Sequence, residues 1–431
     1  MTKWISTTPT SQWTTRAAIS QDGDHPLQIE GLRQRVRGFG GCFNELGMVA
    51  LEELSGSDRK RVLDQLFLPQ GCHFNFCRIP IGASDFACRW YSHNEVDGDF
   101  SMSHFSIEND RRYLLPYIKE AIVRNPDMQF FASPWSPPTW LKFPSVYNFG
   151  TLIWEKPYLT AYAQYFVKFI QAYQAEGIPI HQLHIQNEPC STQKFPSCEW
   201  TGEQFREFIR EYLVPAFHEK QIKTDIWLGT INGPEVDDRK LRTRFNDFAN
   251  VVMEDPICQT EVKGVSYQWA GKYAVQSTHD AWPDLELIQS ESECGDGTNS
   301  WDYARYIFEM IWHYFRNGVS SYVYWNMVLK EGGQSTWGWR QNSMITVVNQ
   351  KVVYQPEFYL MKHFSHFVQP GAHVLRLNGP WSANTVGFEN LDKTQVFVLM
   401  NPFQQEKCVT MRGTTYHLLP LSFNTIVLDP M

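Results

Sequence analysis

Short apolar segments of strand type alternate with longer helical segments along most of this chain. Eight of these segments are apolar or β-branched and end near Gly, Pro, Asn or Glu, as buried strands commonly do. They cover residues 38–43, 74–81, 129–135, 182–186, 225–230, 264–269, 286–290 and 321–325. Because eight strand–helix units close on themselves as a parallel barrel, the pattern predicts an α/β fold of the (β/α)8 TIM-barrel class.

Helical periodicity fills the intervals between these segments. Residues 158–176 carry aromatic side chains at spacings of three and four and stop at Gly177, and residues 301–316 carry an apolar stripe that stops at Asn317 and Gly318. An open, doubly wound sheet is the competing architecture. It is disfavoured because no G-x-G-x-x-G or Walker-type loop follows a strand.

The pattern changes after about residue 358. Short strand-like runs then follow one another without a long helix, at 373–377, 385–389, 395–400, 407–411, 415–418 and 424–428. They predict an antiparallel β side domain. The N-terminal runs 4–8 and 16–19 are also strand-like. We therefore expect residues 1–35 to join the side domain, residues 36–358 to form the catalytic barrel and residues 359–431 to form the side domain itself.

The composition narrows the class of protein. The net charge of −8 comes from 38 basic and 46 acidic residues without a basic run, which argues against nucleic acid as a partner. The first residues lack the apolar region of a secretory signal, and no apolar run is long enough for a membrane span, so we expect a cytoplasmic protein. The nine cysteines are odd in number and favour reduced thiols over disulfides or a structural zinc.

Two of the predicted barrel strands deliver a glutamate to the same rim. The fourth ends in His184-Ile-Gln-Asn-Glu-Pro189 and the seventh in Gln289-Ser-Glu-Ser-Glu-Cys-Gly295. A barrel places its reactive groups at the carboxyl ends of its strands, so Glu188 and Glu291 are expected to face one cleft. Glycoside cleavage needs two such carboxyls, about 5–5.5 Å apart for retention and about 6.5–9.5 Å for inversion.

Neighbouring residues suit the same chemistry. Asn187 can donate a hydrogen bond to the sugar hydroxyl beside the reacting carbon, and Pro189 can end the strand and aim Glu188. A metal-dependent hydrolase would need a cluster of His and Asp at the strand ends, where His184 stands alone. We therefore expect no metal and no cofactor.

Several longer motifs resemble one known family, glycoside hydrolase family 30, the glucosylceramidase-like retaining β-glycosidases. They run in family order through residues 38–342. They are Gly38-Phe-Gly-Gly-Cys-Phe43, Arg78-Ile-Pro-Ile-Gly-Ala-Ser-Asp-Phe86, Ala132-Ser-Pro-Trp-Ser-Pro-Pro-Thr-Trp-Leu-Lys142, Gln186-Asn-Glu-Pro189, Gln289-Ser-Glu291, Trp325-Asn326, and Gly332-Gly333 followed by Trp339-Arg-Gln-Asn342. The resemblance implies a barrel with a side β-domain built from both chain ends, no cofactor and retention of configuration.

The resemblance also implies roles for single residues. Glu188 matches the acid/base and Glu291 the nucleophile, while Arg78 would hold the nucleophile ionised because a nearby positive charge lowers a carboxyl pKa. Other matching positions are expected to bind the first sugar. They are Asp85, Trp135, Asn187, Trp269, Trp325 and Asn342.

The chain departs from the family pattern at two places. Glu293 follows Glu291 by two residues and would share its strand face, so it is an alternative nucleophile. Gln268 and Ala270 stand where glucosylceramidase-like members carry a histidine and a tyrosine. The contact of that tyrosine with the nucleophile would be lost or supplied by Tyr267, which puts a ceramide glucoside substrate in doubt.

The sequence thus predicts a retaining β-glycoside hydrolase for a carbohydrate substrate with gluco-, xylo-, fuco- or galacto-configured sugars. Cutting from a chain end is favoured if long loops close the pocket, and the candidate loops are 89–103 and 193–202. A transglycosylase and a catalytically silent carbohydrate-binding protein on the same barrel are the alternatives. No oligomeric state is predicted.

Overall fold

The computed structural model describes residues 3–17, 26–233 and 248–430. Eight parallel strands close into a barrel and follow chain order around it, which confirms the predicted (β/α)8 class. They are β4 (Gly38–Cys42), β5 (Phe76–Ile81), β6 (Gln129–Pro134), β9 (Gln182–His184), β10 (Asp225–Ile231), β11 (Val262–Gln268), β12 (Glu286–Glu291) and β13 (Val319–Asn326). All eight overlap the ranges expected from the sequence.

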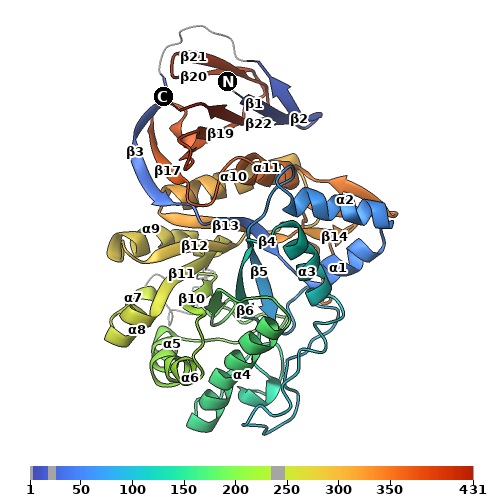
Figure 1. The fold of residues 1–431 in the computed structure, drawn as a ribbon, viewed down its shortest axis with the longest axis vertical. Helices are drawn as coiled ribbons and strands as arrows, with labels where there is room; N and C mark the ends of the chain where they lie inside the picture. The colour runs from blue at the N-terminus through green and yellow to red at the C-terminus, as the bar shows by residue number, and fades with distance from the viewer. Residues whose placement is uncertain (1–2, 18–25, 234–247, 431) are drawn as a thin grey trace.

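Helices surround this barrel (Figure 1). They are α1 (Glu45–Glu52), α2 (Gly56–Phe67), α3 (Leu114–Arg124), α4 (Lys156–Ala175), α5 (Gly202–Phe208), α6 (Val214–Glu219), α7 (Phe248–Met253), α8 (Pro256–Glu261), α9 (Lys272–Ala281), α10 (Trp301–Arg316) and α11 (Pro356–Ser365). The Ser300 side chain accepts the Tyr303 amide and so caps the first turn of α10. No helix in the described ranges is both long and apolar enough to cross a membrane.

The interior of the barrel is a packed aromatic and aliphatic layer, consisting of Phe76, Phe131, Trp227, Ile288 and Val323. His184 completes this layer, with its ring stacked on Trp227 at 5.4 Å between centroids. Burial lowers the pKa of His184 well below its ordinary value, and its two ring nitrogens lie within hydrogen-bond distance of Ser266 and Gln182. His184 is therefore a neutral member of the barrel core.

The two chain ends meet in one antiparallel sheet of seven strands, at the top of Figure 1. Its order is β2 (Ser11–Arg16), β1 (Lys3–Thr8), β22 (Ser422–Leu428), β19 (Gln395–Asn401), β18 (Thr385–Glu389), β17 (His373–Asn378) and β3 (Gln28–Arg35). A hairpin of β20 (Lys407–Met411) and β21 (Thr414–Leu418) lies beside it. The predicted N-terminal run 4–8 matches β1, whereas 16–19 extends beyond the described residues and β3 was not anticipated. The exact domain limits stay a prediction.

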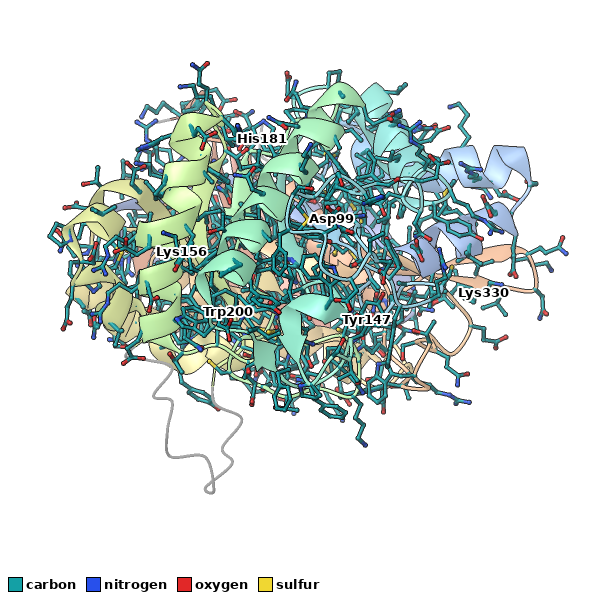
Figure 2. All side chains as sticks on the ribbon, turned by 90° about the horizontal axis from the view of Figure 1, so that it is seen from below. Asp99, Tyr147, Lys156, His181, Trp200 and Lys330 are labelled. Carbon is teal, nitrogen blue, oxygen red and sulfur yellow. The ribbon has the colours of Figure 1, made fainter. Side chains whose placement is uncertain are left out.

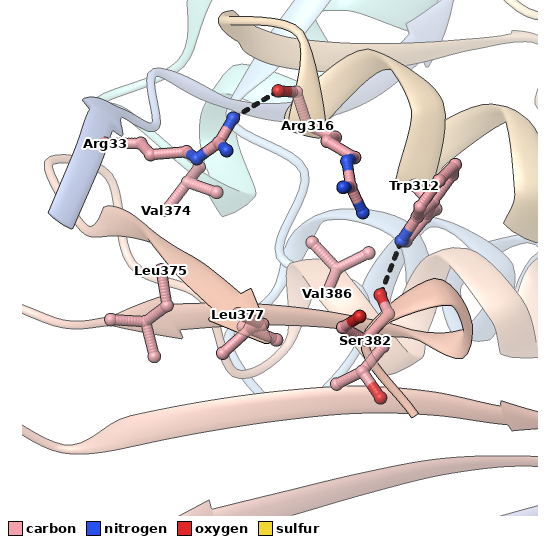
Figure 3. A pocket seen from close by; sticks show the side chains of 10 residues that line it. Arg33, Trp312, Arg316, Val374, Leu375, Leu377, Ser382 and Val386 are labelled. Atoms are coloured by element: carbon pink, nitrogen blue, oxygen red, sulfur yellow. Dashed lines mark hydrogen bonds between the residues drawn. The ribbon is translucent and has the colours of Figure 1, made fainter. Parts of the chain in front are cut away.

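Helices α10 and α11 lie between the barrel and this sheet (Figure 1). The Trp312 indole donates to the Ser382 carbonyl at 2.8 Å, and Arg33 of β3 donates to the Arg316 carbonyl, around a small hollow of about 30 Å³ (Figure 3). On α11, the buried His363 lies 2.8 Å from the hydroxyls of both Thr7 and Thr425. These direct bonds tie the barrel to strands from both chain ends.

The loops that follow the barrel strands gather at one rim. Figure 2 places His181, which precedes β9, near the top, and Trp200 and Tyr147, which follow strands, in the lower half. Several short elements lie on or near this side. They are η1 (Thr139–Leu141), β7 (Lys142–Phe143), β8 (Thr151–Leu152), η4 (Trp269–Gly271), β14 (Val328–Lys330), β15 (Ile345–Val348) and β16 (Lys351–Tyr354).

Candidate active site

Arg78 lies at the centre of the polar cluster on this rim. It projects from β5 with no part of its side chain exposed. Its guanidinium donates to Glu291, to Asn187 Oδ1 at 2.6 Å, to Ser133 Oγ at 2.8 and 3.0 Å, and to Thr230 Oγ1 at 3.1 Å. A buried guanidinium with this many acceptors has one fixed orientation, so it positions side chains from four other strand ends.

Gln268 of β11 is the second donor to the same acceptors. Its Nε2 lies 3.1 Å from Glu291 Oε2, 2.8 Å from Asn187 Oδ1 and 3.0 Å from Thr230 Oγ1. The backbone carbonyl of Gln268 accepts the Tyr314 hydroxyl from α10. Gln268, which the sequence marked only as a departure from the family, is thus a direct partner of Glu291.

Tyr267 does not take the place of the missing tyrosine. Its ring is fully buried on the outer side of the barrel, and its hydroxyl lies 2.6 Å from Thr278 Oγ1 of α9. The expectation that Tyr267 contacts the nucleophile is therefore wrong, because side chains alternate along β11 and Gln268 is the residue that faces inward.

Glu291 faces the barrel interior because the ladder between β11 and β12 is irregular. Ile288 points into the barrel core, so strict alternation would turn Ser290 inward and Glu291 outward. The pairing instead slips between Gln289 and Glu291, which brings Glu291 opposite Gln268. Such an irregularity re-aims a side chain at a strand end.

Glu293 lies apart from this cluster. Strand β12 ends at Glu291, and Glu293 hydrogen-bonds the Tyr306 hydroxyl of α10, which helps raise the Tyr306 pKa beyond the effect of burial. The expectation that both glutamates share a strand face is therefore wrong. Glu291, not Glu293, meets Arg78.

The surroundings of Glu291 act on its charge in opposite directions. Burial raises the pKa of this carboxyl, while the charge and hydrogen bond of Arg78 lower it. Within the described ranges, both donors to this carboxylate, Arg78 and Gln268, bond Oε2. Because about 10% of the side chain is exposed, Oε1 is the oxygen left to meet a ligand.

Glu188 follows β9 and belongs to the same rim. Its side chain is 8% exposed and its Oε2 accepts Gln193 Nε2 at 2.6 Å. Its backbone has φ of +50°, a region that a non-glycine residue rarely adopts, and its amide donates to the Thr230 carbonyl at 3.0 Å. Strained backbone of this kind concentrates at functional sites.

Shared neighbours connect the two glutamates. Asn187, adjacent to Glu188 in the chain, accepts from both Arg78 and Gln268, which also bond Glu291. Burial raises the pKa of the Cys294 thiol most, and nearby acids that include Glu291 and Glu188 raise it further. The thiol therefore lies near both carboxylates. The structure therefore brings both predicted acids to one site.

Two tryptophans and an aspartate form one wall of the site. Trp135 and Trp325 stack at 5.3 Å between centroids, and the Arg78 guanidinium lies 4.4 Å from the Trp135 ring. Asp85 is bonded by the Trp135 side chain, and its pKa is raised to about 8, first by burial and then by the charge of Glu291. This carboxyl is therefore held near its neutral form.

Asn342 and Trp269 lie outside the polar cluster. Asn342 is fully buried; its Nδ2 donates to Glu357 at 2.8 Å and its Oδ1 accepts the amides of Gly297 and Asn299. It thus holds the loop after β12. Trp269 lies at the rim in η4, half-buried beside Lys272.

Sequence patterns missed four residues of this neighbourhood: Ser133, Thr230, Gln193 and Glu357. Ser133 and Thr230 were detectable in principle, since each is a polar residue at the end of an otherwise apolar strand. In the described part of the chain, no three His, Cys, Asp or Glu side chains lie close enough together to hold a metal ion.

Comparison with known proteins gives the family to which this barrel and its side sheet belong. The glycosyl hydrolase family 30 TIM-barrel domain matches residues 36–368. The chain therefore belongs to glycosyl hydrolase family 30, a family of O-glycosyl hydrolases whose substrates are carbohydrates.

Individual relatives differ in what they are named for. A Caenorhabditis elegans protein provisionally named glucosylceramidase 2 is 31% identical over 91% of this chain and 80% of its own length. The endo-1,6-β-D-glucanase of Trichoderma harzianum is 27% identical over 86% of this chain and 79% of its own. The crystal structure of SrfJ from Salmonella typhimurium superposes with a TM-score of 0.89 at 24% identity, covering 100% of both chains, which shows the same fold.

Proposed function

We propose that this protein is a retaining β-glycoside hydrolase in which Glu291 is the nucleophile and Glu188 the acid/base. The observation that carries the proposal is the double hydrogen bonding of Glu291 Oε2 by Arg78 and Gln268. These donors hold the carboxylate in one orientation and oppose its neutralisation by burial. They leave Oε1 to attack an anomeric carbon.

In the first step, Glu291 Oε1 forms a bond to the anomeric carbon while the bond to the leaving oxygen breaks. The bonding electrons pass to that oxygen, and Glu188 donates the proton that it needs. The second step reverses these roles. Glu188 removes a proton from water, the water oxygen displaces Glu291, and the sugar leaves with its β configuration.

Asn187 is oriented to assist this transition state. Arg78, Gln268 and Thr230 all donate to its Oδ1, at 2.6, 2.8 and 3.0 Å. The amide is therefore turned with Nδ2 away from these donors, where it can donate to the hydroxyl beside the anomeric carbon. A bond of this kind strengthens as positive charge develops on the sugar ring.

The proposed substrate is a β-linked, gluco-configured glycoside, with xylo-, fuco- and galacto-configured sugars as the wider set. The relatives support glucose, since the names of a glucosylceramidase and an endo-1,6-β-D-glucanase both denote glucosyl groups, and the second name specifies a β linkage. The first-sugar wall of Trp135, Trp325 and Asp85 supplies a stacking face and a polar anchor.

The test compares Glu291→Ala and Glu188→Ala on 2,4-dinitrophenyl β-glucoside and on a β-1,6-linked glucose disaccharide. We expect Glu291→Ala to lose at least about 10⁴-fold on both, and Glu188→Ala to lose about 10²–10⁴-fold on the disaccharide but much less on the aryl glycoside, whose leaving group needs no proton. Added azide should restore Glu188→Ala turnover and yield the β-glucosyl azide. Glu293→Ala is the matched control and should keep its activity.

Proton NMR of the first-formed product gives an independent check. Retention requires that β-glucose appears before it equilibrates with the α anomer. Initial release of the α anomer, or near-normal turnover by Glu291→Ala, would overturn the assignment. Aryl release with the sugar appearing only in longer oligosaccharides would instead identify a transglycosylase, and sugar binding without any turnover would identify a silent binding protein.

A further inference from the structure

A short hairpin between β14 and β15 projects from the rim of the site. The Gln341 amide donates to the Gly333 carbonyl at 2.9 Å, and the Ser335 amide to the Trp339 carbonyl at 2.7 Å. At the tip, the Gly338 amide donates back to Ser335 at 3.1 Å, and Gly338 has φ of +96°, which an L side chain rarely adopts. The backbone is thus a closed, internally bonded turn.

This hairpin presents two tryptophans. Trp337 and Trp339 meet edge to face at 5.1 Å and 87°. Trp339 is 47% exposed, whereas Trp337 is half-buried and packs against Phe195 at 5.7 Å. Trp337 also packs on the buried cluster that contains Trp135 and Trp325. Trp337 therefore connects the buried cluster that contains the first-sugar wall to the exposed ring of Trp339.

Contacts on both sides place this surface next to the reacting groups. The Thr336 hydroxyl donates to the Asp85 carbonyl at 3.2 Å, which fixes the hairpin to the first-sugar wall. Phe195 belongs to the same loop as Gln193, the side chain that bonds Glu188. Because the acid/base protonates the leaving oxygen, groups beside Glu188 border the leaving group.

We propose that Trp337, Trp339 and Phe195 form the binding site for a leaving-group sugar, so that the substrate is a β-linked glucose oligosaccharide. The proposal rests on the proposed function and extends it. A β-glucosyl ring carries its hydroxyls equatorially and exposes an apolar C–H face, which an indole face covers well. A large aromatic side chain left half exposed at the mouth of a pocket marks a binding surface.

The residues that frame the two tryptophans favour a sugar over an acyl chain. The hairpin reads Gln-Ser-Thr-Trp-Gly-Trp-Arg-Gln from Gln334 to Gln341, so polar side chains flank each ring. Gln334, Thr336 and Arg340 are exposed beside them and offer donors and acceptors for hydroxyls. A lipid leaving group would need contiguous apolar surface at this place.

The experiment measures kcat/KM of wild type, Trp339→Ala and Trp337→Ala on two probes. β-Glucosyl fluoride has no leaving-group sugar and reports the first-sugar site alone, whereas β-1,6-linked glucose di- and tetrasaccharides also need the leaving-group site. We expect Trp339→Ala to lower kcat/KM for the oligosaccharides about 10-fold more than for the fluoride, mainly through KM, as loss of one stacking partner predicts. Phe403→Ala, which removes a 50% exposed aromatic ring from the side domain, is the matched control.

The outcomes separate this inference from the proposed function. Inactivity of the wild type on the β-fluorides of glucose, xylose, fucose and galactose would overturn the proposed function itself. If the wild type is active but both tryptophan variants lose kcat/KM equally on the two probes, or on neither probe, only the leaving-group site is overturned. A selective loss on glucosylceramide in detergent micelles, without a loss on oligosaccharides, would replace the sugar with a lipid and also overturn it. Oligosaccharide-selective loss in both variants supports it.

Discussion

Strand β12 carries a glutamate at each end, and both are bonded by an arginine. At the amino end, Glu286 accepts Arg37 at 2.8 and 2.5 Å, and these side chains are 30% and 28% exposed. At the carboxyl end, Glu291 accepts Arg78, and these are 10% and 0% exposed. The same pair of residue types therefore occupies two different environments, about one strand length apart.

The difference lies in what else reaches each pair. At the amino end, Arg37 also donates to Gln129 at 3.0 Å, and Glu286 also accepts the Ser320 hydroxyl at 2.7 Å. These bonds and contact with solvent satisfy the hydrogen-bonding groups of the pair. At the carboxyl end, Arg78 is shared among three acceptors besides Glu291, namely Ser133, Asn187 and Thr230, and one oxygen of the Glu291 carboxylate is left over. An ion pair is a candidate site when it is buried and one of its oxygens has no hydrogen-bond donor. The formation of an ion pair alone does not make a site.

The largest expected effect is on activity. Glu291→Gln should lower kcat/KM on 2,4-dinitrophenyl β-glucoside by at least about 10⁴-fold, because an amide cannot form the glycosyl ester. Glu286→Gln should stay within about twofold of wild type, since it lies at the opposite end of the barrel. Steady-state kinetics of the two variants measure the contrast. Comparable losses would show that the two ends are not functionally distinct.

The second effect is on stability. Arg78→Met should lower the free energy of unfolding by about 3–5 kcal/mol, because Glu291 is left buried without its cation. Arg37→Met should cost about 1 kcal/mol or less, since Glu286 can turn to water. Urea unfolding followed by tryptophan fluorescence measures both. If Arg37→Met proved the more damaging change, the burial argument would be wrong.

The third effect is on the pH dependence of stability. The pKa of Asp85 is raised to about 8 by burial and by Glu291, from an ordinary value near 3.8. Between these values the folded state holds a proton that the unfolded state has lost, so stability falls as pH rises. This proton contributes a decline of up to about 1.4 kcal/mol per pH unit to the free energy of unfolding, and Asp85→Asn should remove that contribution.

Urea midpoints at pH 5, 6, 7 and 8 test that slope. Asp302→Asn, which alters an 85% exposed aspartate on α10, serves as the control and should retain the wild-type slope. An Asp85→Asn protein that is as pH-sensitive as wild type would place the titrating group elsewhere.

The smallest effect is on salt dependence. The destabilisation caused by Arg37→Met should shrink in 1 M NaCl by a few tenths of a kcal/mol, since partly exposed charges are screened over about 3 Å at that ionic strength. The destabilisation caused by Arg78→Met should change less, because the Arg78 guanidinium is fully buried and the pair is less exposed than that of Arg37 and Glu286. Repeating the urea titrations with and without salt decides this. If salt reduced the cost of Arg78→Met as much as the cost of Arg37→Met, the argument from burial of the Arg78 pair would be wrong.

Much of this architecture was readable from local pattern. The eight barrel strands overlap the expected ranges because buried parallel strands are short apolar runs, whatever their partners are. Glu188 and Glu291 were identified because the carboxyl ends of such strands share one rim. Helix α10 followed from its apolar stripe and from its stop at Asn317 and Gly318.

Other features lay beyond local pattern. Strand β3 is mostly exposed, so it lacks an apolar signature and exists through its pairing with β17. The inward turn of Glu291 depends on a slip in the ladder between two strands, which alternation within β12 could not reveal. Gln268 was noticed only as an unusual residue, since its role depends on Arg78, Asn187 and Glu291 converging on it.

The sequence by itself determined which segments are strands and helices and which acids stand at strand ends, because hydrophobic periodicity and turn chemistry act between near neighbours. Only the tertiary structure decided which of those acids is bonded by Arg78 and Gln268 and keeps one carboxylate oxygen for a ligand. Burial, shared hydrogen bonds and ion pairing are set by side chains that lie as far as 213 positions apart in the chain, as between Arg78 and Glu291. These energies exist only once the barrel has closed.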